Sequence, residues 1–274
     1  MSDTLRVAIA QMNSGDSIAD SMREVEGLVG RAAAQGAKLL ALPENATQLA
    51  PSAQRLAEAE TLDGPQMQRI AAAAVAHDIA VLVGSFAERG PDAAHTFATT
   101  VVISRRGEQI GVYRKNHLFD VQVAADTALR ESDTIAPGPL GAVVCDVDGW
   151  KLGLSICYDL RFPEHYRALV AGGAELLAVP AAFTFRTGAA HWEVLLRARA
   201  IENQCYVIAP AQVGQHYGRR ESFGHAMAVD PWGTVLAQCG DRQEEGGSLC
   251  FADVMRPTLE SVRQRLPCLE HRRV

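Results

Sequence analysis

The chain has 274 residues, of which 48% are apolar and 21% charged, and its formal net charge is −6 at pH 7. This composition is that of an ordinary folded protein and excludes disordered and fibrous classes. The charge comes without a long run of one sign, which favours a small-molecule substrate over nucleic acid or an anionic membrane surface.

Short apolar runs alternate with segments of helical period in the first third of the chain. The predicted elements are a strand over 5–12, a helix over 18–36, a strand over 38–44, a helix over 65–78 and a strand over 80–88. Gly36 ends the first helix, and Pro65 suits the first turn of the second. The first three elements form a βαβ unit.

Two hairpins interrupt this alternation and make the expected sheet mixed. They lie over 97–115, around Arg106-Gly107, and over 143–157, around Asp148-Gly149. The remaining predicted elements are a helix near 163–173, a strand over 175–183, a helix over 191–204, strands over 205–213, within 223–240 and over 248–254, and a helix near 256–266. We expect a single domain over 1–274 of the α/β class, built as a four-layer α-β-β-α sandwich.

The chain carries no sign of secretion, a membrane span or a bound metal. Segment 1–12 contains Asp3 and only a short apolar stretch, unlike a signal peptide, and no window approaches the ~20 apolar residues of a membrane span. The six cysteines include no Cys-x-x-Cys pair, which argues against a zinc site and a disulfide-rich fold. The glycine-rich nucleotide motifs are absent as well. We expect a cytoplasmic protein with reduced thiols.

Three predicted strands end in a reactive or charged side chain. Glu44 follows KLLALP, Lys115 follows QIGVYR and Cys157 follows KLGLSI. Because ligands of α/β sheets bind outside strand ends, we expect these side chains to converge on one site. Each has an ordinary alternative: Cys157 as a core thiol, Glu44 as a solvated turn residue, Lys115 as part of a basic loop. The polar segment YDLR after Cys157 favours a reactive thiol, since helix N-termini and cations stabilise a thiolate.

Together the three side chains supply what acyl transfer from an amide requires. They are a nucleophile, a general base that becomes a general acid, and a cation for the developing oxyanion. A cysteine paired with a histidine is the alternative, and His117, His191 and His225 each lie near one of these segments. No local signature around Cys157 supports such a pair.

Three motifs carry a resemblance to a known family. LPE (42–44), YRKNHLFD (113–120) and GLSICYDLRFPE (153–164) resemble, in this order, the carbon-nitrogen hydrolase (nitrilase) superfamily, and the likeness runs along nearly the whole chain. The resemblance implies an amidase that needs no cofactor, and it implies a homodimer, since relatives commonly dimerise.

The resemblance also implies roles for individual residues. Cys157 would be the nucleophile, Glu44 the general base and acid, and Lys115 the stabiliser of the oxyanion, together with the backbone N–H of Tyr158. The additional active-site glutamate of the family would be Glu131, in RESDTIAPG. The alternative for Glu131 is a loop carboxylate without a part in the chemistry.

Two later segments narrow the resemblance to a branch of the superfamily. Segments 181–216 and 224–239 resemble the deaminated glutathione amidase branch more than the ω-amidase branch. The first branch implies hydrolysis of the amide between a 2-oxoglutaryl group and Cys-Gly, through a cysteine thioester. The second implies hydrolysis of 2-oxoglutaramate or 2-oxosuccinamate to the 2-oxo diacid and ammonia.

Both kinds of substrate carry a 2-oxo acid carboxylate, so a cation is expected in the pocket. Arg161 is the candidate, with a structural salt bridge as its alternative. Phe183, Thr184, His191 and Trp192 are expected to shape the acyl pocket, although His191 and Trp192 could instead cap and pack the following helix. The chain departs from relatives at Asn45-Ala46 and at Arg186, which bears on substrate size and charge.

Overall fold

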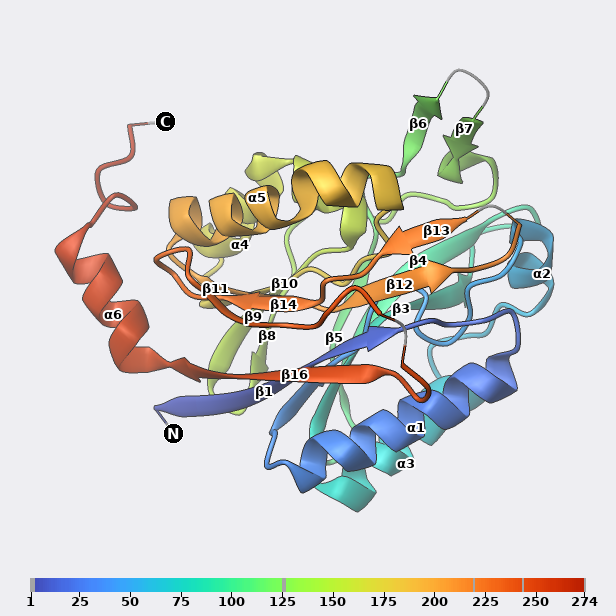
Figure 1. The fold of residues 1–274 in the computed structure, drawn as a ribbon, viewed down its shortest axis with the longest axis horizontal. Helices are drawn as coiled ribbons and strands as arrows, with labels where there is room; N and C mark the ends of the chain where they lie inside the picture. Colours follow the sequence, from blue (N-terminus) through green and yellow to red (C-terminus); the bar gives the residue numbers. More distant parts are fainter. Residues whose placement is uncertain (1–2, 125–126, 219, 243, 274) are drawn as a thin grey trace.

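The computed structural model describes residues 3–124, 127–218, 220–242 and 244–273. Its two large sheets lie face to face, with helices on the outer side of each (Figure 1). The larger sheet has eight strands in the order β13-β12-β1-β2-β3-β4-β5, with β16 also paired to β1, and the smaller has six in the order β15-β14-β11-β10-β9-β8. This arrangement confirms the predicted α-β-β-α sandwich.

The strands of the larger sheet are short to medium in length. They are β1 (Thr4–Met12), β2 (Leu39–Ala41), β3 (Ala80–Arg89), β4 (Thr96–Ile103), β5 (Gln109–Arg114), β12 (Ala211–Gln215), β13 (Glu221–Phe223) and β16 (Ser248–Met255). The strands of the smaller sheet are β8 (Val144–Val147), β9 (Trp150–Leu154), β10 (Leu176–Ala178), β11 (Tyr206–Ala209), β14 (Met227–Val229) and β15 (Val235–Gln238). A separate hairpin pairs β6 (Asp120–Ala124) with β7 (Thr127–Arg130).

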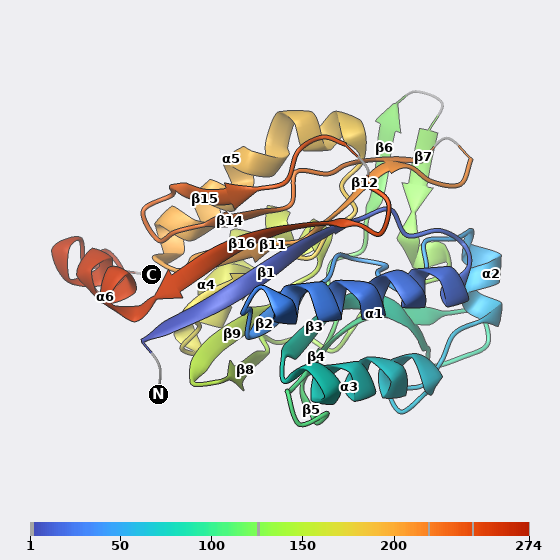
Figure 2. The same ribbon diagram turned by 60° about the horizontal axis from the view of Figure 1, so that its bottom comes forward.

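The helices lie outside the two sheets. They are α1 (Ile18–Ala34), α2 (Ser52–Ala57), α3 (Pro65–His77), α4 (Pro163–Ala171), α5 (Phe185–Asn203) and α6 (Arg256–Arg265). Figure 2 shows α1 and α3 side by side against the larger sheet, with β1 and β16 adjacent behind them. Among the described residues, no helix is both long enough and apolar enough to cross a membrane.

The alternation of side chains along β1 divides the core into two layers. Val7 and Ile9 pack with residues of the smaller sheet, such as Leu152 and Leu154, between the two sheets. Ala8, Ala10 and Met12 face the opposite way and pack against α1 and α3. A strand buried on both faces reads as a continuous apolar run, which is why 5–12 has no polar residue before Gln11 except Arg6.

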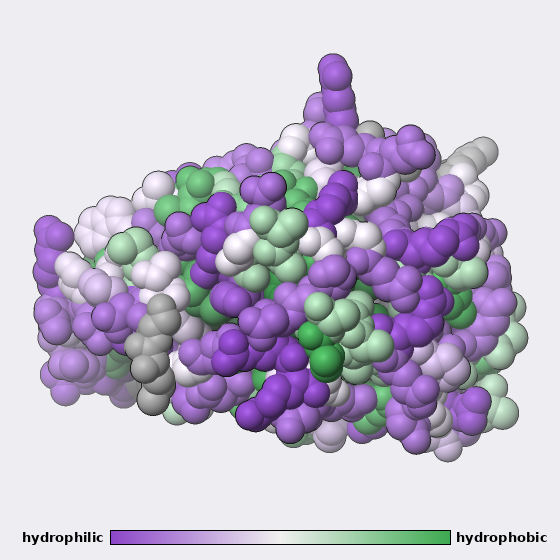
Figure 3. Space-filling view, turned by 90° about the horizontal axis from the view of Figure 1, so that it is seen from below, coloured by the Kyte–Doolittle hydropathy of each residue, from purple (hydrophilic) through white to green (hydrophobic). Residues whose placement is uncertain are grey.

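The outer surface on the α1 and α3 side is polar. Figure 3 shows this face, where hydrophilic residues predominate and apolar ones gather only in small groups. The apolar sides of the helices are therefore turned inward, as expected for amphipathic helices that cover a sheet.

Four predicted elements differ from the structure. The strands predicted over 38–44 and 175–183 are shorter, as β2 and β10. The predicted strand over 205–213 is two strands, β11 in the smaller sheet and β12 in the larger, because Pro210 between them lacks an N–H and the chain crosses between sheets there. The helix predicted over 191–204 begins at Phe185. Its first turns contain Thr187 and Gly188, which are poor helix formers, and a Cβ at Gly188 would overlap the ring of Phe223.

Candidate active site

Glu44, Lys115 and Cys157 meet at one end of the sandwich, between the two sheets. Glu44 follows β2, Lys115 follows β5 directly, and Cys157 opens a 3₁₀ turn, Cys157–Arg161, that follows β9. The predicted convergence of the three strand ends is therefore present. All three side chains are buried, with relative exposures of 3%, 1% and 8% for the residues in chain order.

Two hydrogen bonds fix the carboxylate of Glu44. The Nζ of Lys115 donates to Oε1 at 2.9 Å, and the backbone N–H of Ala182 donates to Oε2 at 2.9 Å. The loop that carries Glu44 lies directly on Gly84 of β3, where a Cβ would overlap the carbonyl oxygens of Leu42 and Pro43. Only glycine permits this close approach of two backbones.

Lys115 lies between two carboxylates. Its Nζ also donates to both oxygens of Glu131, at 3.0 and 2.9 Å. Glu131 begins a 3₁₀ turn after β7, and the backbone N–H of Phe119 donates to its Oε2 at 2.8 Å. The buried ammonium is therefore held in place from two directions, and Glu131 is part of the same ionic cluster.

The protonation states follow from burial and from these charges. Burial alone would raise the pKa of Glu44, but the charge and hydrogen bond of Lys115 outweigh it and hold that pKa below its ordinary value. Burial alone would lower the pKa of Lys115, but Glu131 and Glu44 raise it. Glu44 is thus a carboxylate and Lys115 an ammonium in the resting site.

Cys157 rests as a neutral thiol. Burial, and then the negative charge of Glu44, raise its pKa well above the ordinary value of a thiol. The thiol and the carboxylate of Glu44 border the same cavity. The backbone of Cys157 has a φ of 48°, in the left-handed region that residues with a side chain rarely adopt, and its N–H donates to Pro180 O at 2.9 Å.

Asp159 holds the turn that presents the thiol. Its Oδ2 accepts from the backbone N–H of Ile156 at 2.8 Å, and its Oδ1 accepts from the backbone N–H of His117 at 3.2 Å and lies 2.7 Å from His117 Nδ1. Asp159 is completely buried, so these partners compensate the cost of burying its charge. The sequence YDLR suggested a polar turn here, and the aspartate of this segment, Asp159, accepts a hydrogen bond from the backbone at the start of that turn.

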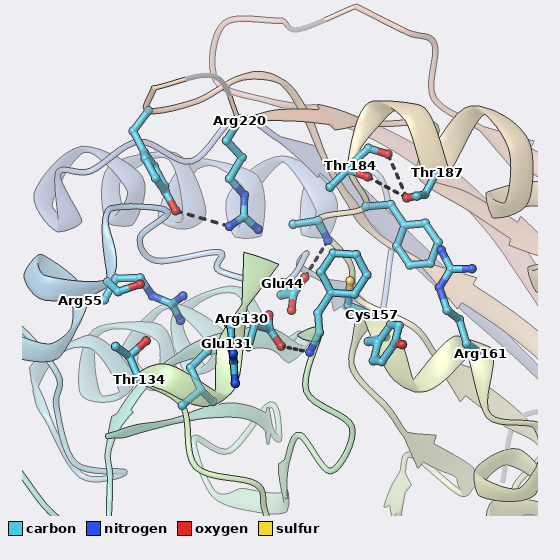
Figure 4. A pocket seen from close by; sticks show the side chains of 17 residues that line it. Glu44, Arg55, Arg130, Glu131, Thr134, Cys157, Arg161, Thr184, Thr187 and Arg220 are labelled. Carbon is cyan, nitrogen blue, oxygen red and sulfur yellow. Dashed lines mark hydrogen bonds between the residues drawn. The ribbon is translucent and has the colours of Figure 1, made fainter. Parts of the chain in front are cut away.

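A cavity of about 190 Å³ opens onto Cys157 and Glu44 (Figure 4). Its further lining comes from α2, the β6–β7 hairpin, the 3₁₀ turn after β9, the loop before α5 and the β12–β13 turn. These lining residues are Ser52, Arg55, Phe119, Arg130, Glu131, Thr134, Ile135, Tyr158, Arg161, Ala182, Phe183, Thr184, Thr187, Tyr217 and Arg220.

Four of the residues expected to bind substrate line this cavity. They are Tyr158, Arg161, Phe183 and Thr184. Arg161 forms no salt bridge among the described residues; its guanidinium lies 5.1 Å from the centre of the Phe183 ring, and its Nη1 is 3.2 Å from Nδ1 of His191.

The other two expected residues lie elsewhere. Trp192 is outside the cavity lining, because it is buried behind Phe183, 4.9 Å between ring centres, and its indole N–H donates to His225 O at 2.8 Å. His191 borders a neighbouring hollow that it shares with Arg161 and Arg186. Trp192 thus supports the pocket wall from behind.

Two arginines that line the cavity across from Arg161, Arg55 and Arg220, were not predicted from the sequence. Arg55 lies in α2, which was not predicted, and Arg220 lies just before β13. In the sequence, QRLAE and GRRE are ordinary for exposed polar segments, so only their position in the fold distinguishes these residues.

No described histidine is hydrogen bonded to Cys157. His117 contacts Asp159, His191 contacts Arg161, and Nδ1 of His225 is 3.0 Å from Phe223 O. In the same described part of the chain, no cluster of His, Cys, Asp or Glu side chains has the arrangement of a metal site. The geometry therefore favours carboxylate-assisted attack by a thiol.

The chain is similar to known proteins over nearly its full length. Residues 6–264 match the carbon-nitrogen hydrolase family. A deaminated glutathione amidase of Synechocystis is 42% identical over 267 residues, 97% of each chain. The human deaminated glutathione amidase is 41% identical over 271 residues, 97% of this chain and 82% of its own.

A solved structure supports the same assignment. The crystal structure of a Saccharomyces cerevisiae member of branch 10 of the nitrilase superfamily has a TM-score of 0.86 and 29% identity, over 100% of this chain and 98% of its own. The resemblance drawn from the three motifs is thereby confirmed. This chain belongs to the carbon-nitrogen hydrolase family.

Proposed function

We propose that this protein is an amidase that hydrolyses deaminated glutathione to 2-oxoglutarate and Cys-Gly. The observation that carries the chemistry is the buried cluster in which Lys115 joins Glu44 to Glu131 beside the Cys157 thiol. Relatives with 41–42% identity over 97% of the chain bear this name, which supports the choice of substrate.

In the first half of the reaction, the Cys157 sulfur attacks the amide carbonyl carbon. Because the thiol is neutral and faces the same cavity as the Glu44 carboxylate, its proton passes to that carboxylate as the S–C bond forms. The protonated Glu44 then gives the proton to the nitrogen. The C–N bond breaks, Cys-Gly leaves, and a thioester remains on Cys157.

In the second half, water replaces the leaving group. The oxygen of the water attacks the thioester carbon while Glu44 accepts a proton from that water. Glu44 then gives the proton to the sulfur of Cys157 as the C–S bond breaks. The products are 2-oxoglutarate and the free thiol, so one water is consumed and the site regains its starting protonation. No redox change or further reactant is involved.

Both tetrahedral intermediates carry a negative oxygen that needs stabilisation. Lys115 and the backbone N–H of Tyr158 are the proposed donors, and Tyr158 lies in the first turn of the 3₁₀ helix, where N–H groups have no partner within the helix. Glu131 keeps Lys115 charged and in position. Electrostatic donors of this kind contribute roughly 10²–10³ in rate each.

We also propose a single domain over 1–274 and a cytoplasmic homodimer. The family match over 6–264 and the core shared by both sheets support one domain. Exposed apolar side chains on α5, β15 and the adjoining turn, among them Val194, Ile201 and Trp232, support a subunit contact on that side. Molar mass measured by light scattering tests the dimer.

The substrate assignment is tested by comparing two amides with the purified protein. We expect Cys-Gly release from deaminated glutathione to have the larger kcat/KM, and ammonia release from 2-oxoglutaramate the smaller. The reverse order would make the protein an ω-amidase. A thioester mass on Cys157, seen by intact mass spectrometry after rapid quenching, would identify the intermediate.

A further inference from the structure

We propose that Gln212 is a positioning residue for the reaction, because it holds Glu44 both by its main chain and by its carboxylate. The inference rests on the proposed function, in which Glu44 moves the proton in both half-reactions. Gln212 lies in β12 of the larger sheet, is completely buried and does not line the cavity. It therefore acts through Glu44 and not by contact with a substrate.

The side-chain amide of Gln212 binds the main chain of Glu44. Its Nε2 donates to the carbonyl oxygen of Glu44 at 2.9 Å and to the hydroxyl of Ser14 at 2.8 Å. Its Oε1 accepts from the backbone N–H of Ser14 at 2.9 Å. Both amide hydrogens and the amide oxygen thus have partners, which fixes the orientation of this buried side chain.

Ser14 extends the contact to the residues that follow Glu44. Its hydroxyl donates to the carbonyl oxygen of Ala46 at 3.1 Å, so the pair of Gln212 and Ser14 holds the main chain at Glu44 and again at Ala46. Asn45, between them, has a φ of 58°, in the left-handed region. Such a backbone persists only where its surroundings hold it, and the two side chains supply that support.

The main chain of Gln212 holds the other end of Glu44. The N–H of Gln212 donates to the carbonyl oxygen of Ala181 at 2.9 Å. The next residue, Ala182, donates its own N–H to Oε2 of Glu44 at 2.9 Å. The main chain and the carboxylate of Glu44 are therefore both tied to one residue of β12. A shift of the carboxylate away from Lys115 is opposed at both ends.

A second buried glutamine shows that burial alone does not produce this arrangement. Gln66 in α3 is also buried, yet its Oε1 has no hydrogen-bond partner among the described residues. The amide of Gln212, in contrast, is fully paired, and its partners belong to the general base and to the segment that supports it. This difference makes Gln66 a suitable control position.

The test separates kcat from KM in Gln212→Met, which keeps the length of the side chain but has no hydrogen-bond donor. We expect kcat for deaminated glutathione and for 2-oxoglutaramate to fall by the same factor, roughly 10–10²-fold, because a catalytic group displaced by about 1 Å loses rate on that order. KM should stay close to that of the unmodified enzyme, since Gln212 does not line the cavity. The assays are run below the melting transition of the variant.

The pH profile gives a measurement that loss of packing alone would not change. Burial would raise the pKa of Glu44, but Lys115 outweighs burial and holds that pKa below its ordinary value. A carboxylate that moves away from Lys115 loses this effect. The acid limb of kcat/KM should therefore lie at higher pH in Gln212→Met than in the unmodified enzyme.

Two further variants complete the experiment. Gln66→Met makes the same substitution at the other buried glutamine and should change neither kcat nor the acid limb. Ser14→Ala removes the hydroxyl that joins Gln212 to Ala46, and should lower kcat less than Gln212→Met does, with KM unchanged. It decides the question if Gln212→Met does not fold. Circular dichroism melting shows whether each variant is folded.

Three results would overturn the proposal. They are an unchanged kcat in folded Gln212→Met, or in Ser14→Ala if Gln212→Met does not fold; a fall in kcat with the acid limb unmoved; and an equal fall in Gln66→Met. Failure of the proposed function gives a different pattern. In that case the unmodified enzyme does not cleave deaminated glutathione, while Gln212→Met still lowers kcat for 2-oxoglutaramate.

Discussion

The phenolic hydroxyl of Tyr113 donates a hydrogen bond of 2.8 Å to Oδ2 of Asp159, within the core. Tyr113 precedes Lys115 by two residues, and Asp159 follows Cys157 by two. Together with the two contacts of His117 to the same carboxylate, this hydrogen bond joins the strand end that carries the cation in the larger sheet to the turn that carries the thiol in the smaller. The distance between cation and nucleophile therefore depends on Asp159 and its partners.

Replacing Tyr113 with Phe should impair both stability and catalysis. We expect a loss of about 1–2 kcal/mol in the free energy of unfolding, because Asp159 keeps a buried oxygen with one donor fewer. Urea denaturation measures this loss. If Tyr113 also positions the site, kcat falls while KM stays close to normal at temperatures where the variant is fully folded; an unchanged kcat there would limit Tyr113 to a structural role.

Cys157→Ala should abolish turnover and leave the fold intact. We expect a loss of about 10⁴-fold or more in kcat, since removing a nucleophile eliminates the covalent route. The stability should change little, because the thiol is small and borders a cavity. Steady-state assays with a matched melting curve test both parts, and appreciable residual activity would contradict the nucleophile assignment.

Glu44→Gln should stop both half-reactions. The amide cannot accept the thiol proton, so we expect a fall of roughly 10²–10⁴-fold in kcat/KM and no burst of Cys-Gly. Asp16, in an exposed turn, offers a control as Asp16→Asn. A full burst of Cys-Gly followed by slow turnover would show instead that Glu44 is needed only for hydrolysis of the thioester.

The acid side of the pH profile should reflect the lowered pKa of Glu44. In the folded protein Lys115 outweighs the effect of burial and keeps this carboxylate ionised below the ordinary range. Its contribution to stability is therefore present above the unfolded pKa and is lost as the pH falls through the folded pKa. We therefore expect kcat/KM, measured as a function of pH, to show no loss from Glu44 until the pH falls below the ordinary pKa of a glutamate, about 4.3, as long as the enzyme stays folded.

Gly84→Ala should displace the Glu44 loop. A Cβ would overlap the carbonyl oxygens of Leu42 and Pro43, so either the loop or β3 must move. We expect a destabilisation of roughly 1–3 kcal/mol and a larger fractional loss of kcat than of stability. Gly27→Ala is the matched control, since nothing lies within 4 Å of its Cβ position in α1 and alanine favours a helix.

The strands, the layers of the fold and three of the site residues could be predicted from the apolar runs in the sequence and from the residues at the ends of those runs. Glu44, Lys115 and Cys157 were found because each follows a buried strand, and a chemically reactive side chain at such a place is conspicuous in the sequence. The layers of the fold followed from the order of strands and helices. Both depend on local patterns that a sequence displays directly.

Contacts between distant segments were not predictable in this way. Arg55 and Arg220 are 165 positions apart and lie in segments with ordinary polar composition. The division of 205–213 into two strands could not be predicted from its composition. CYVIAPAQV is apolar on both sides of Pro210, and an apolar run does not show which of the two sheets it joins. The early start of α5 at Phe185 depends on packing against Phe223, which outweighs weak helix propensity.

The passage of the chain through Pro210 has a mechanical consequence. A single residue separates β11 in one sheet from β12 in the other, so the connection has no slack. Beside this link, Ala181 pairs with Ala211 of β12, and the N–H of the next residue, Ala182, donates to Glu44. The segment that binds the carboxylate is thus fastened to the larger sheet, which also carries Glu44, and the two would move together if one sheet slid over the other.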